Sequence, residues 1–158
     1  MGASAITITE ERKANIDFAD PYYDSLQSLL VKTDSGITKL ADLAGKNIGV
    51  QAGTTGQNYA KENAPADAQL IDFPSDGELW PAIQSGQIDA ILQDQPVNRE
   101  HEVADAGYKI VETYSTDEQY GFAFDKGNKT ALLNAVNEQL AAIRADGTYD
   151  AIYAKYFG

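Results

Sequence analysis

Two short segments carry residues that could bind a small charged molecule, and each directly follows a predicted strand. The first is the glycine-rich turn Val50–Gly56 (VQAGTTG), which opens a predicted helix. Backbone N–H groups at a helix N-terminus bind anions, so this turn suits a carboxylate. It has neither the Gly-Lys-Ser/Thr of a P-loop nor the G-x-G-x-x-G of dinucleotide-binding folds, so nucleotide binding has little support. The alternative is a glycine-permitted turn in which Thr54 or Thr55 caps the helix.

The second segment is Ile91–Pro96 (ILQDQP), in which Asp94 ends a buried strand and Pro96 suits the first turn of a helix. Asp94 could accept hydrogen bonds from an ammonium group, or it could simply cap the helix. The guanidinium of Arg12 could bind a carboxylate with two parallel hydrogen bonds, or it could form an exposed ion pair with a neighbouring glutamate. Together these segments supply a guanidinium and a helix N-terminus that can both bind a carboxylate, and an aspartate that can accept from an ammonium group. These are the groups that binding of a zwitterion requires.

The composition excludes several other kinds of chemistry. The chain has no cysteine, which excludes thiol catalysis, disulfides and cysteine-ligated zinc. Because His101 is the only histidine, multi-histidine metal sites are excluded and a Ser-His-Asp triad is disfavoured. We therefore predict no catalytic residue, no metal and no other cofactor, and we expect His101, in the polar run 98–102, to be a solvated surface residue. The net charge of −12 would repel phosphates, so nucleic acid is not expected as a partner.

The remaining bulk properties are those of a globular chain. It is 43% hydrophobic and 23% charged, which is enough apolar content to bury a core. No apolar run approaches the ~20 residues that a membrane helix needs. No signal peptide is visible, because residues 1–4 lead directly into strand-like sequence.

The elements that must position the charged groups alternate between strands and short helices. Strands are predicted over residues 5–9, 25–31, 47–51, 69–72, 89–93, 108–111 and 119–124, and residues 113–118 are predicted to be a loop. Helices are predicted over 40–43, 53–63 and 75–84. A further helix begins at 96, another ends at 147, and a short one lies at the C-terminus. The helix over 75–84 has a capping box from Ser75 to Glu78, and Pro81 predicts a late start or a kink in it. This alternation favours a mostly parallel α/β sheet. Residues 22–112 form one self-contained lobe, and the chain crosses into and out of it, which suggests a hinge.

Six segments of the chain, in order, give it a resemblance to a known family. They are Ala5–Arg12, Ile16–Tyr23, Leu43–Gly56, Gly86–Asp94, Tyr120–Gly127 and Asp146–Phe157. With these segments the chain resembles the periplasmic or lipoprotein polar amino-acid-binding proteins of ABC transporters (solute-binding protein family 3, with the type II periplasmic-binding-protein fold). The resemblance implies two α/β lobes that close on a free polar amino acid.

The resemblance also assigns roles to individual residues. Arg12 matches the arginine that clamps the α-carboxylate, helped by the backbone N–H of Thr55, and Asp94 matches the aspartate that takes the α-ammonium. Thr7 and the carbonyl of Ala5 match further contacts of these two groups, and two glutamines match positions that meet the ligand side chain. The predicted ligand-binding set is Ala5, Thr7, Arg12, Gln51, Gly53, Thr54, Thr55, Gln93 and Asp94.

The sequence departs from the family pattern because it starts at the strand that leads out of the first lobe. The expected fold is α/β, with one complete lobe and an incomplete second lobe joined by a two-strand hinge. Residues 1–20 would be the hinge strand and a remnant of lobe 1, residues 21–116 the complete lobe 2, and residues 117–158 the return strand and C-terminal helices of lobe 1. Strands 5–9 and 119–124 would then lack partners, so we expect poorly ordered flanks or a homo-oligomer formed by strand or domain exchange.

These expectations define the predicted function and two alternatives. The leading interpretation is an N-terminally truncated, extracytoplasmic amino-acid-binding component of an ABC uptake system, which is periplasmic or lipid-anchored. Its parent would deliver the amino acid to the transporter permease, and the truncated chain would bind weakly. One alternative is an enzyme of the same fold, similar to cyclohexadienyl dehydratase, although Asp94 is the only candidate for its general acid. The other is a truncated or engineered fragment that only folds or oligomerises.

Overall fold

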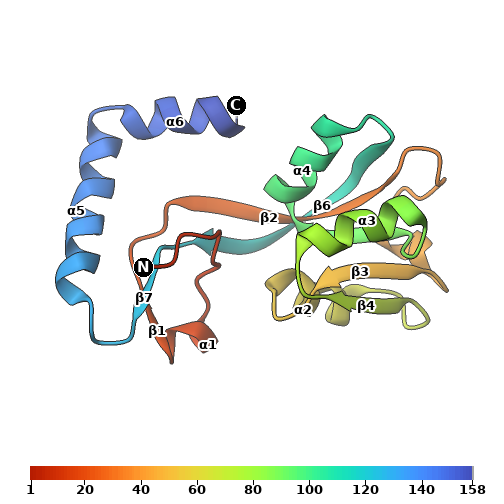
Figure 1. The fold of residues 1–158 in the computed structure, drawn as a ribbon, viewed down its shortest axis with the longest axis horizontal. Helices are drawn as coiled ribbons and strands as arrows, with labels where there is room; N and C mark the ends of the chain where they lie inside the picture. Colours follow the sequence, from red (N-terminus) through yellow and green to blue (C-terminus); the bar gives the residue numbers. More distant parts are fainter. Residues whose placement is uncertain (158) are drawn as a thin grey trace. The chain divides into compact units, whose positions relative to one another are not determined.

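The computed structural model describes residues 1–157, which form two compact units (Figure 1). The central unit is the continuous stretch Leu26–Thr116, and the flanking unit combines Met1–Ser25 with the residues from Asp117 onward. The chain passes between the units twice, inside strand β2 (Tyr23–Lys32) and inside strand β6 (Tyr108–Tyr120). Both passages therefore lie within continuous strands.

The central unit is built on a five-stranded mixed sheet with the strand order β4-β3-β5-β2-β6. Its three short strands are β3 (Asn47–Gln51), β4 (Gln69–Phe73) and β5 (Ala90–Asp94). Strand β3 runs parallel to β4 and to β5, as the alternating pattern predicts. Strand β2 runs antiparallel to β5 and places Gln27 opposite Asp94, so the sheet is less parallel than expected.

Helices cover both faces of this sheet, so its central strands are apolar on both sides (Figure 1). The central unit contains η1 (Leu40–Leu43), α2 (Thr55–Asn63), α3 (Asp76–Ser85) and α4 (Gln95–Ala104). Leu29 and Leu92 pack on the side of η1 and α2, whereas Leu30 and Ile91 pack on the side of α3. Since successive side chains of a strand alternate between faces, the unbroken run of apolar residues in β2 and β5 supplies both cores. Each fully buried side chain of this kind contributes about 1.5–3 kcal/mol.

Helix α3 differs in two details from its prediction. It continues from Asp76 to Ser85 through Pro81, with neither a late start nor a break. The proline is the sixth of ten helical residues, and its missing N–H removes a single backbone hydrogen bond. Ser75 is the N-cap residue, but its side chain makes no capping hydrogen bond, so the predicted capping box is not formed.

The flanking unit contains a small two-stranded sheet and three helices. Strand β1 (Ile16–Phe18) pairs antiparallel with β7 (Ala123–Asp125), and the helices are α1 (Glu10–Lys13), α5 (Thr130–Ala145) and α6 (Thr148–Phe157). The strand predicted over residues 5–9 is wrong: Thr7 makes one isolated bridge to Tyr120, and Ala5 has a positive φ of 49°, which interrupts an extended chain.

Strand β6 is longer than predicted and changes the description of residues 113–124. It continues to Tyr120, so the loop expected at 113–118 is wrong. The strand expected at 119–124 is instead divided between the end of β6 and the start of β7. Residues 113–116 (TYST) are β-branched, aromatic and small, and this composition favours an extended chain over a loop.

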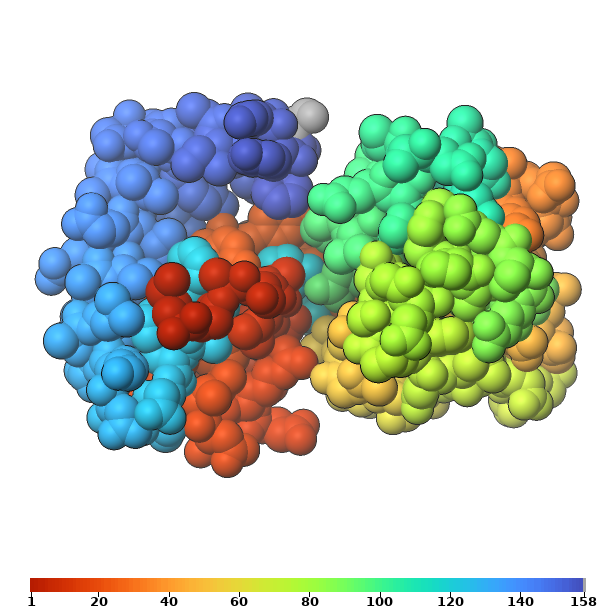
Figure 2. Space-filling model, in the orientation of Figure 1, coloured from red at the N-terminus to blue at the C-terminus, as the bar shows by residue number. Residues whose placement is uncertain are grey.

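The two C-terminal helices keep much of their apolar surface exposed. Helix α5 buries only Leu140, and α6 buries none of its residues. Figure 2 shows these helices, in blue, on the outside of the flanking unit. The large exposed apolar side chains on them are Leu132, Ile152, Tyr153, Tyr156 and Phe157. No helix among residues 1–157 has the length and apolar character to cross a bilayer.

Candidate functional site

The glycine-rich turn between β3 and α2 forms the helix start that its sequence predicts. Gly53 adopts a left-handed φ of 74°, which favours glycine. Thr54 is the N-cap of α2: its Oγ1 accepts a hydrogen bond from the backbone N–H of Gln57 at 3.2 Å and donates one to the Gln51 carbonyl at 2.8 Å. The turn is therefore a capped helix start, as the second interpretation of its sequence predicts. The binding of an anion by its N–H groups stays a prediction.

Asp94 lies at the carboxyl end of β5, and a glutamine from the neighbouring strand holds its side chain. Nε2 of Gln27 donates to Oδ1 of Asp94 at 2.6 Å and lies 3.4 Å from Oγ1 of Thr55. Asp94 is the N-cap residue of α4, yet its side chain makes no capping hydrogen bond. The structure thus brings Thr55 and Asp94 together through Gln27, which is completely buried.

Gln27 belongs to this candidate site but is not among the residues predicted from the sequence, although its strand contains a signal. The predicted strand SLQSLLV is apolar at its C-terminal end but carries Ser25, Gln27 and Ser28, all of which are buried. A polar side chain in a strand buried on both faces needs a hydrogen-bonding partner, so such a residue indicates a polar network inside the fold.

Gly56 allows the first turn of α2 to approach this end of the sheet closely. A Cβ atom at position 56 would lie 2.8 Å from Oε1 of Gln27 and 3.3 Å from the Cα of Gln93. The first of these distances is shorter than real Cβ contacts, so only glycine fits without a shift. The N–H groups at the start of α2 are consequently held close to the Asp94 end of β5.

Gln93 lies next to Asp94 but belongs to a different polar network. Its Nε2 donates to Oδ1 of Asp76 at 2.9 Å and to Oδ1 of Asn98 at 3.0 Å. Nδ2 of Asn98 in turn donates to the carbonyl oxygen of Ser28 at 3.2 Å and to its Oγ at 2.9 Å. This network joins the starts of α3 and α4 to β2 and β5, and Gln93 is only 6% exposed.

His101 belongs to the same network, so its prediction as a solvated surface residue is wrong. Its Nε2 lies 2.9 Å from Oδ1 of Asp76, and its ring stacks on Trp80 with the ring centroids 4.2 Å apart. The side chain is only 16% exposed. The polar neighbours of His101 in the sequence concealed this environment, because both partners come from α3 rather than from its own helix.

Two further glutamines make hydrogen bonds at the glycine-rich turn between β3 and α2. Nε2 of Gln51 donates to the carbonyl oxygen of Pro74 at 3.4 Å. Gln57, which is buried, donates from Nε2 to Oδ1 of Asp72 at 2.7 Å, and its Oε1 accepts from the backbone N–H of Gly53 at 3.1 Å. The turn is therefore fixed by side chains on both of its flanks.

The other predicted residues lie together in the flanking unit. Nη1 of Arg12 donates to the Thr7 carbonyl at 2.9 Å, and Oγ1 of the buried Thr7 donates to Oε2 of Glu118 at 2.9 Å. The ion pair on helix α1 is formed by Lys13 and Glu10 at 2.7 Å. The predicted set thus falls into two groups, with Ala5, Thr7 and Arg12 in the flanking unit and the six other residues in the central unit.

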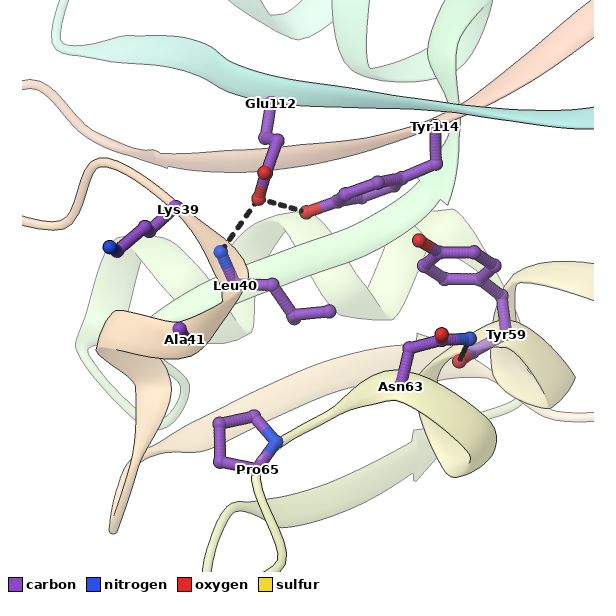
Figure 3. Close-up of a pocket in the computed structure, with 8 residues that line it drawn as sticks. All are labelled: Lys39, Leu40, Ala41, Tyr59, Asn63, Pro65, Glu112 and Tyr114. Carbon is purple, nitrogen blue, oxygen red and sulfur yellow. Dashed lines mark hydrogen bonds between the residues drawn. The ribbon is translucent and has the colours of Figure 1, made fainter.

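A cavity of about 590 Å³ in the central unit shares no residue with the predicted set. It is lined by Lys39, Leu40, Ala41, Tyr59, Asn63, Pro65, Glu112 and Tyr114 (Figure 3). Oε2 of Glu112 accepts from the backbone N–H of Leu40 at 2.8 Å and from the Tyr114 hydroxyl at 2.7 Å. The Tyr59 ring stacks on Tyr114, with the centroids 4.7 Å apart. These bonds tie η1 to β6, so the polar groups of this cavity have a structural role.

Similarity to a known protein family extends over the whole chain. Residues 1–158 match the family of bacterial extracellular solute-binding proteins, family 3. The ABC transporter glutamine-binding protein GlnH of Bacillus subtilis (strain 168) is 37% identical over 155 residues, which are 97% of this chain and 56% of that protein. The chain thus spans a little more than half the length of this curated relative.

Solved structures give the same result. An ancestral arginine-binding protein bound to glutamine superimposes with a TM-score of 0.87 and 41% identity, over 98% of this chain and 69% of that one. An ancestral amino acid-binding protein that is a precursor of cyclohexadienyl dehydratase gives a TM-score of 0.84 and 38% identity, over 98% of this chain and 66% of that one. The predicted α/β fold of the periplasmic amino-acid-binding proteins is confirmed. The chain belongs to the bacterial extracellular solute-binding proteins, family 3.

Proposed function

We propose that this chain is part of the amino-acid-binding component of an ABC uptake system and that its ligand is a free polar amino acid. The observation that carries the proposal is the arrangement at the carboxyl end of the central sheet. There Gln27 joins the Asp94 carboxylate to Thr55 at the start of α2. A carboxylate next to a helix N-terminus provides one acceptor for an ammonium group and one set of donors for a carboxylate. The family membership and the names of the relatives support an amino acid as the ligand.

The proposed roles follow the chemistry of each group. Asp94 accepts from the α-ammonium, and the backbone N–H groups of Thr55 and its neighbours in the turn, Gly53 and Thr54, donate to the α-carboxylate. Arg12 provides a further donor to the α-carboxylate. Thr7 and the Ala5 carbonyl supply secondary contacts. Gln51 and Gln93 are proposed to meet the ligand side chain.

The test of this proposal is a titration of the chain with each of the common amino acids, followed by NMR chemical-shift changes. We expect at least one polar amino acid to bind, with shifts concentrated in the turn 51–56 and at Asp94. Asp94→Asn should weaken binding at least about tenfold, because the ammonium loses a charged acceptor. The matched control is Asp67→Asn, which changes an exposed carboxylate away from the turn and should leave the affinity unchanged. No shifts with any amino acid would refute the proposal.

The named relatives are binding proteins, and we propose that this chain also binds without catalysis. The competing function is that of a dehydratase on the same fold, which would require a general acid at the reacting centre. In the central unit Asp94 is engaged by Gln27 and Asp76 by Gln93, so neither carboxylate is poised as an uncommitted proton donor. Incubation with prephenate or arogenate decides between the two, because measurable turnover would establish the enzyme.

We also propose two partners and a location for the protein. The partner in transport is the permease of an ABC transporter, as the family implies. The proposed location is extracytoplasmic, either in the periplasm or lipid-anchored at the cell surface. The second partner is another copy of this chain, through strand or domain exchange, supported by the apolar surface that α5 and α6 expose. Light scattering between micromolar and millimolar concentration should show a growing dimer fraction, whereas a clean monomer throughout would refute self-association.

A further inference from the structure

The cavity formed by η1, α2 and β6 contains a carboxylate whose charge no cation balances. The volume of the cavity is about 590 Å³, and its charged lining residues are Lys39 and Glu112. Glu112 forms no ion pair with any residue of the described range 1–157. Figure 3 shows the Lys39 ammonium pointing away from Glu112 and from the tyrosine rings of the lining. The charge beside these rings is therefore negative.

The structural hydrogen bonds of Glu112 occupy only one of its carboxylate oxygens. Oε2 accepts from the backbone N–H of Leu40 at 2.8 Å and from the Tyr114 hydroxyl at 2.7 Å. Both donors are neutral, so they leave the charge of the carboxylate in place. Oε1 makes no hydrogen bond within residues 1–157, although a carboxylate oxygen accepts readily. Glu112 therefore keeps an open acceptor together with its charge.

Two aromatic rings and a further acceptor lie near this carboxylate. The rings of Tyr59 and Tyr114 stack with their centroids 4.7 Å apart. Asn63 donates from its amide nitrogen to the Tyr59 carbonyl at 2.9 Å, which leaves the amide oxygen as an acceptor. Burial and, after it, the charge of Glu112 raise the pKa of Tyr59. The negative charge of Glu112 thus acts on Tyr59 as well as on its hydrogen-bonding partner Tyr114.

The rest of the lining is apolar and consists of Leu40, Ala41 and Pro65. Figure 3 shows Leu40 and Ala41 on one side of the cavity and the Tyr59 ring on the other. Ligand sites commonly combine an apolar wall with a small number of polar groups that fix the orientation of the ligand. This cavity has both, because the carboxylate and the amide oxygen accept while the wall is apolar.

We propose that this cavity is a second ligand site, which binds a small organic ammonium ion with an apolar body. The ammonium group pairs with the Glu112 carboxylate and lies near the tyrosine rings, whose faces attract cations. The apolar body packs against the wall of the cavity. An anion would be repelled by Glu112, and a neutral molecule would gain neither attraction. The site shares no residue with the proposed amino-acid site, so the two proposals stand independently.

The test is a titration of the full chain with benzylammonium, using benzyl alcohol as a neutral molecule of nearly the same shape. We expect millimolar binding of benzylammonium, with NMR shift changes at Tyr59 and Tyr114 and an affinity at least about fivefold above that of benzyl alcohol. Added salt should reduce this preference, because the attraction is electrostatic. Equal affinities of the two compounds, or shift changes that avoid both tyrosines, would overturn the proposal.

Glu112→Gln separates the charge from the structural hydrogen bonds. The new amide oxygen still accepts from Leu40 and Tyr114, so the fold should persist while the preference for benzylammonium over benzyl alcohol disappears. Glu62→Gln is the matched control, because it removes an exposed carboxylate of α2 outside the lining and should leave the preference unchanged. A preference that survives Glu112→Gln would contradict the site. If that variant does not fold, Tyr59→Leu replaces it, and an unchanged preference there would contradict the site equally.

A further probe distinguishes a free amine from a lysine side chain of another protein. N-acetyl-lysine amide presents the same ammonium group on a peptide unit. We expect it to bind more weakly than benzylammonium, because its flexible stem covers less of the apolar wall. Equal or tighter binding of the lysine derivative would overturn the assignment to a small molecule and would indicate a protein partner instead.

Discussion

At the scale of single residues, the candidate site depends on buried amides that hold charged groups. Gln27 is the main example, because it lies in the interior and donates to Asp94 at 2.6 Å. The sequence places Asp94 at the end of a strand and Thr55 at the start of a helix, and this much could be predicted from local patterns. The contact with Gln27 could not, since it spans 67 residues and depends on the antiparallel register of β2 against β5.

Gln27→Leu should destabilise the central unit by about 1–3 kcal/mol, because it removes a hydrogen-bond donor from the partly buried carboxylate of Asp94. Urea unfolding at neutral pH measures the change. Gln139→Leu is the matched control on the exposed surface of α5 and should change stability by less than about 0.5 kcal/mol. Equal effects of the two substitutions would show that the Gln27 contact carries no stability.

Tyr114 gives a prediction for alkaline pH. Burial, followed by the hydrogen bond to Glu112 and its charge, raises the pKa of Tyr114 above its ordinary value. The unfolded chain loses this proton near pH ~10, and the folded chain retains it to higher pH. The folded state then binds more protons than the unfolded state, so the stability linked to Tyr114 is fully present below pH ~10 and declines as the pH rises.

Tyr114→Phe should make this alkaline decline shallower and should also lower stability at pH 7, since the hydrogen bond to Glu112 is lost. Denaturant unfolding at pH 7 and across pH 9–11 separates the two effects. An unchanged slope in the variant would mean that Tyr114 ionises equally in both states.

At the scale of elements, the agreement between sequence and structure follows the range of the interactions. The predicted strands at 47–51, 69–72 and 89–93 match β3, β4 and β5 within about one residue, because apolar runs and glycine turns define them locally. The predictions failed at residues 5–9 and 113–124. There the pairing partners come from the opposite end of the chain, as in the bridge between Thr7 and Tyr120.

The start of α2 offers a test at this scale. Gly56→Ala should destabilise the fold by about 1–3 kcal/mol, because the new Cβ would lie 2.8 Å from Oε1 of Gln27 and push the helix from β5. Gly77→Ala is the matched control at the second residue of α3, where the nearest atom, Ser75 Oγ, is 3.6 Å away. That substitution should instead stabilise by about 0.5–1 kcal/mol. Thermal unfolding compares them, and a Gly56→Ala protein as stable as wild type would contradict the close approach.

At the scale of the whole molecule, the two units differ in how much of their surface they bury. The central unit has a core on each face of its sheet, whereas α5 buries one residue and α6 none. Elements with few buried contacts open at lower free energy than the global transition.

Hydrogen exchange should therefore divide along this line. We expect amides of α6 to exchange first, those of α5 next, and those of β3 and β5 last. Mass spectrometry of the exchanging chain measures this order. Raising the protein concentration should slow exchange in α6 if a second copy covers it, and equal protection of α6 and β5 at low concentration would contradict the difference between the units.

The passages through β2 and β6 have a consequence for how such a protein can be assembled or altered. These strands are neighbours in the central sheet, so Leu26 and Thr116 end a segment whose entry and exit lie on adjacent strands. In terms of connectivity, the central unit is an insert within the flanking sequence, and domains whose two ends lie close together are the kind that tolerate insertion. Residues 26–116 should be transferable as one cassette, because a single continuous stretch of gene encodes the whole central unit.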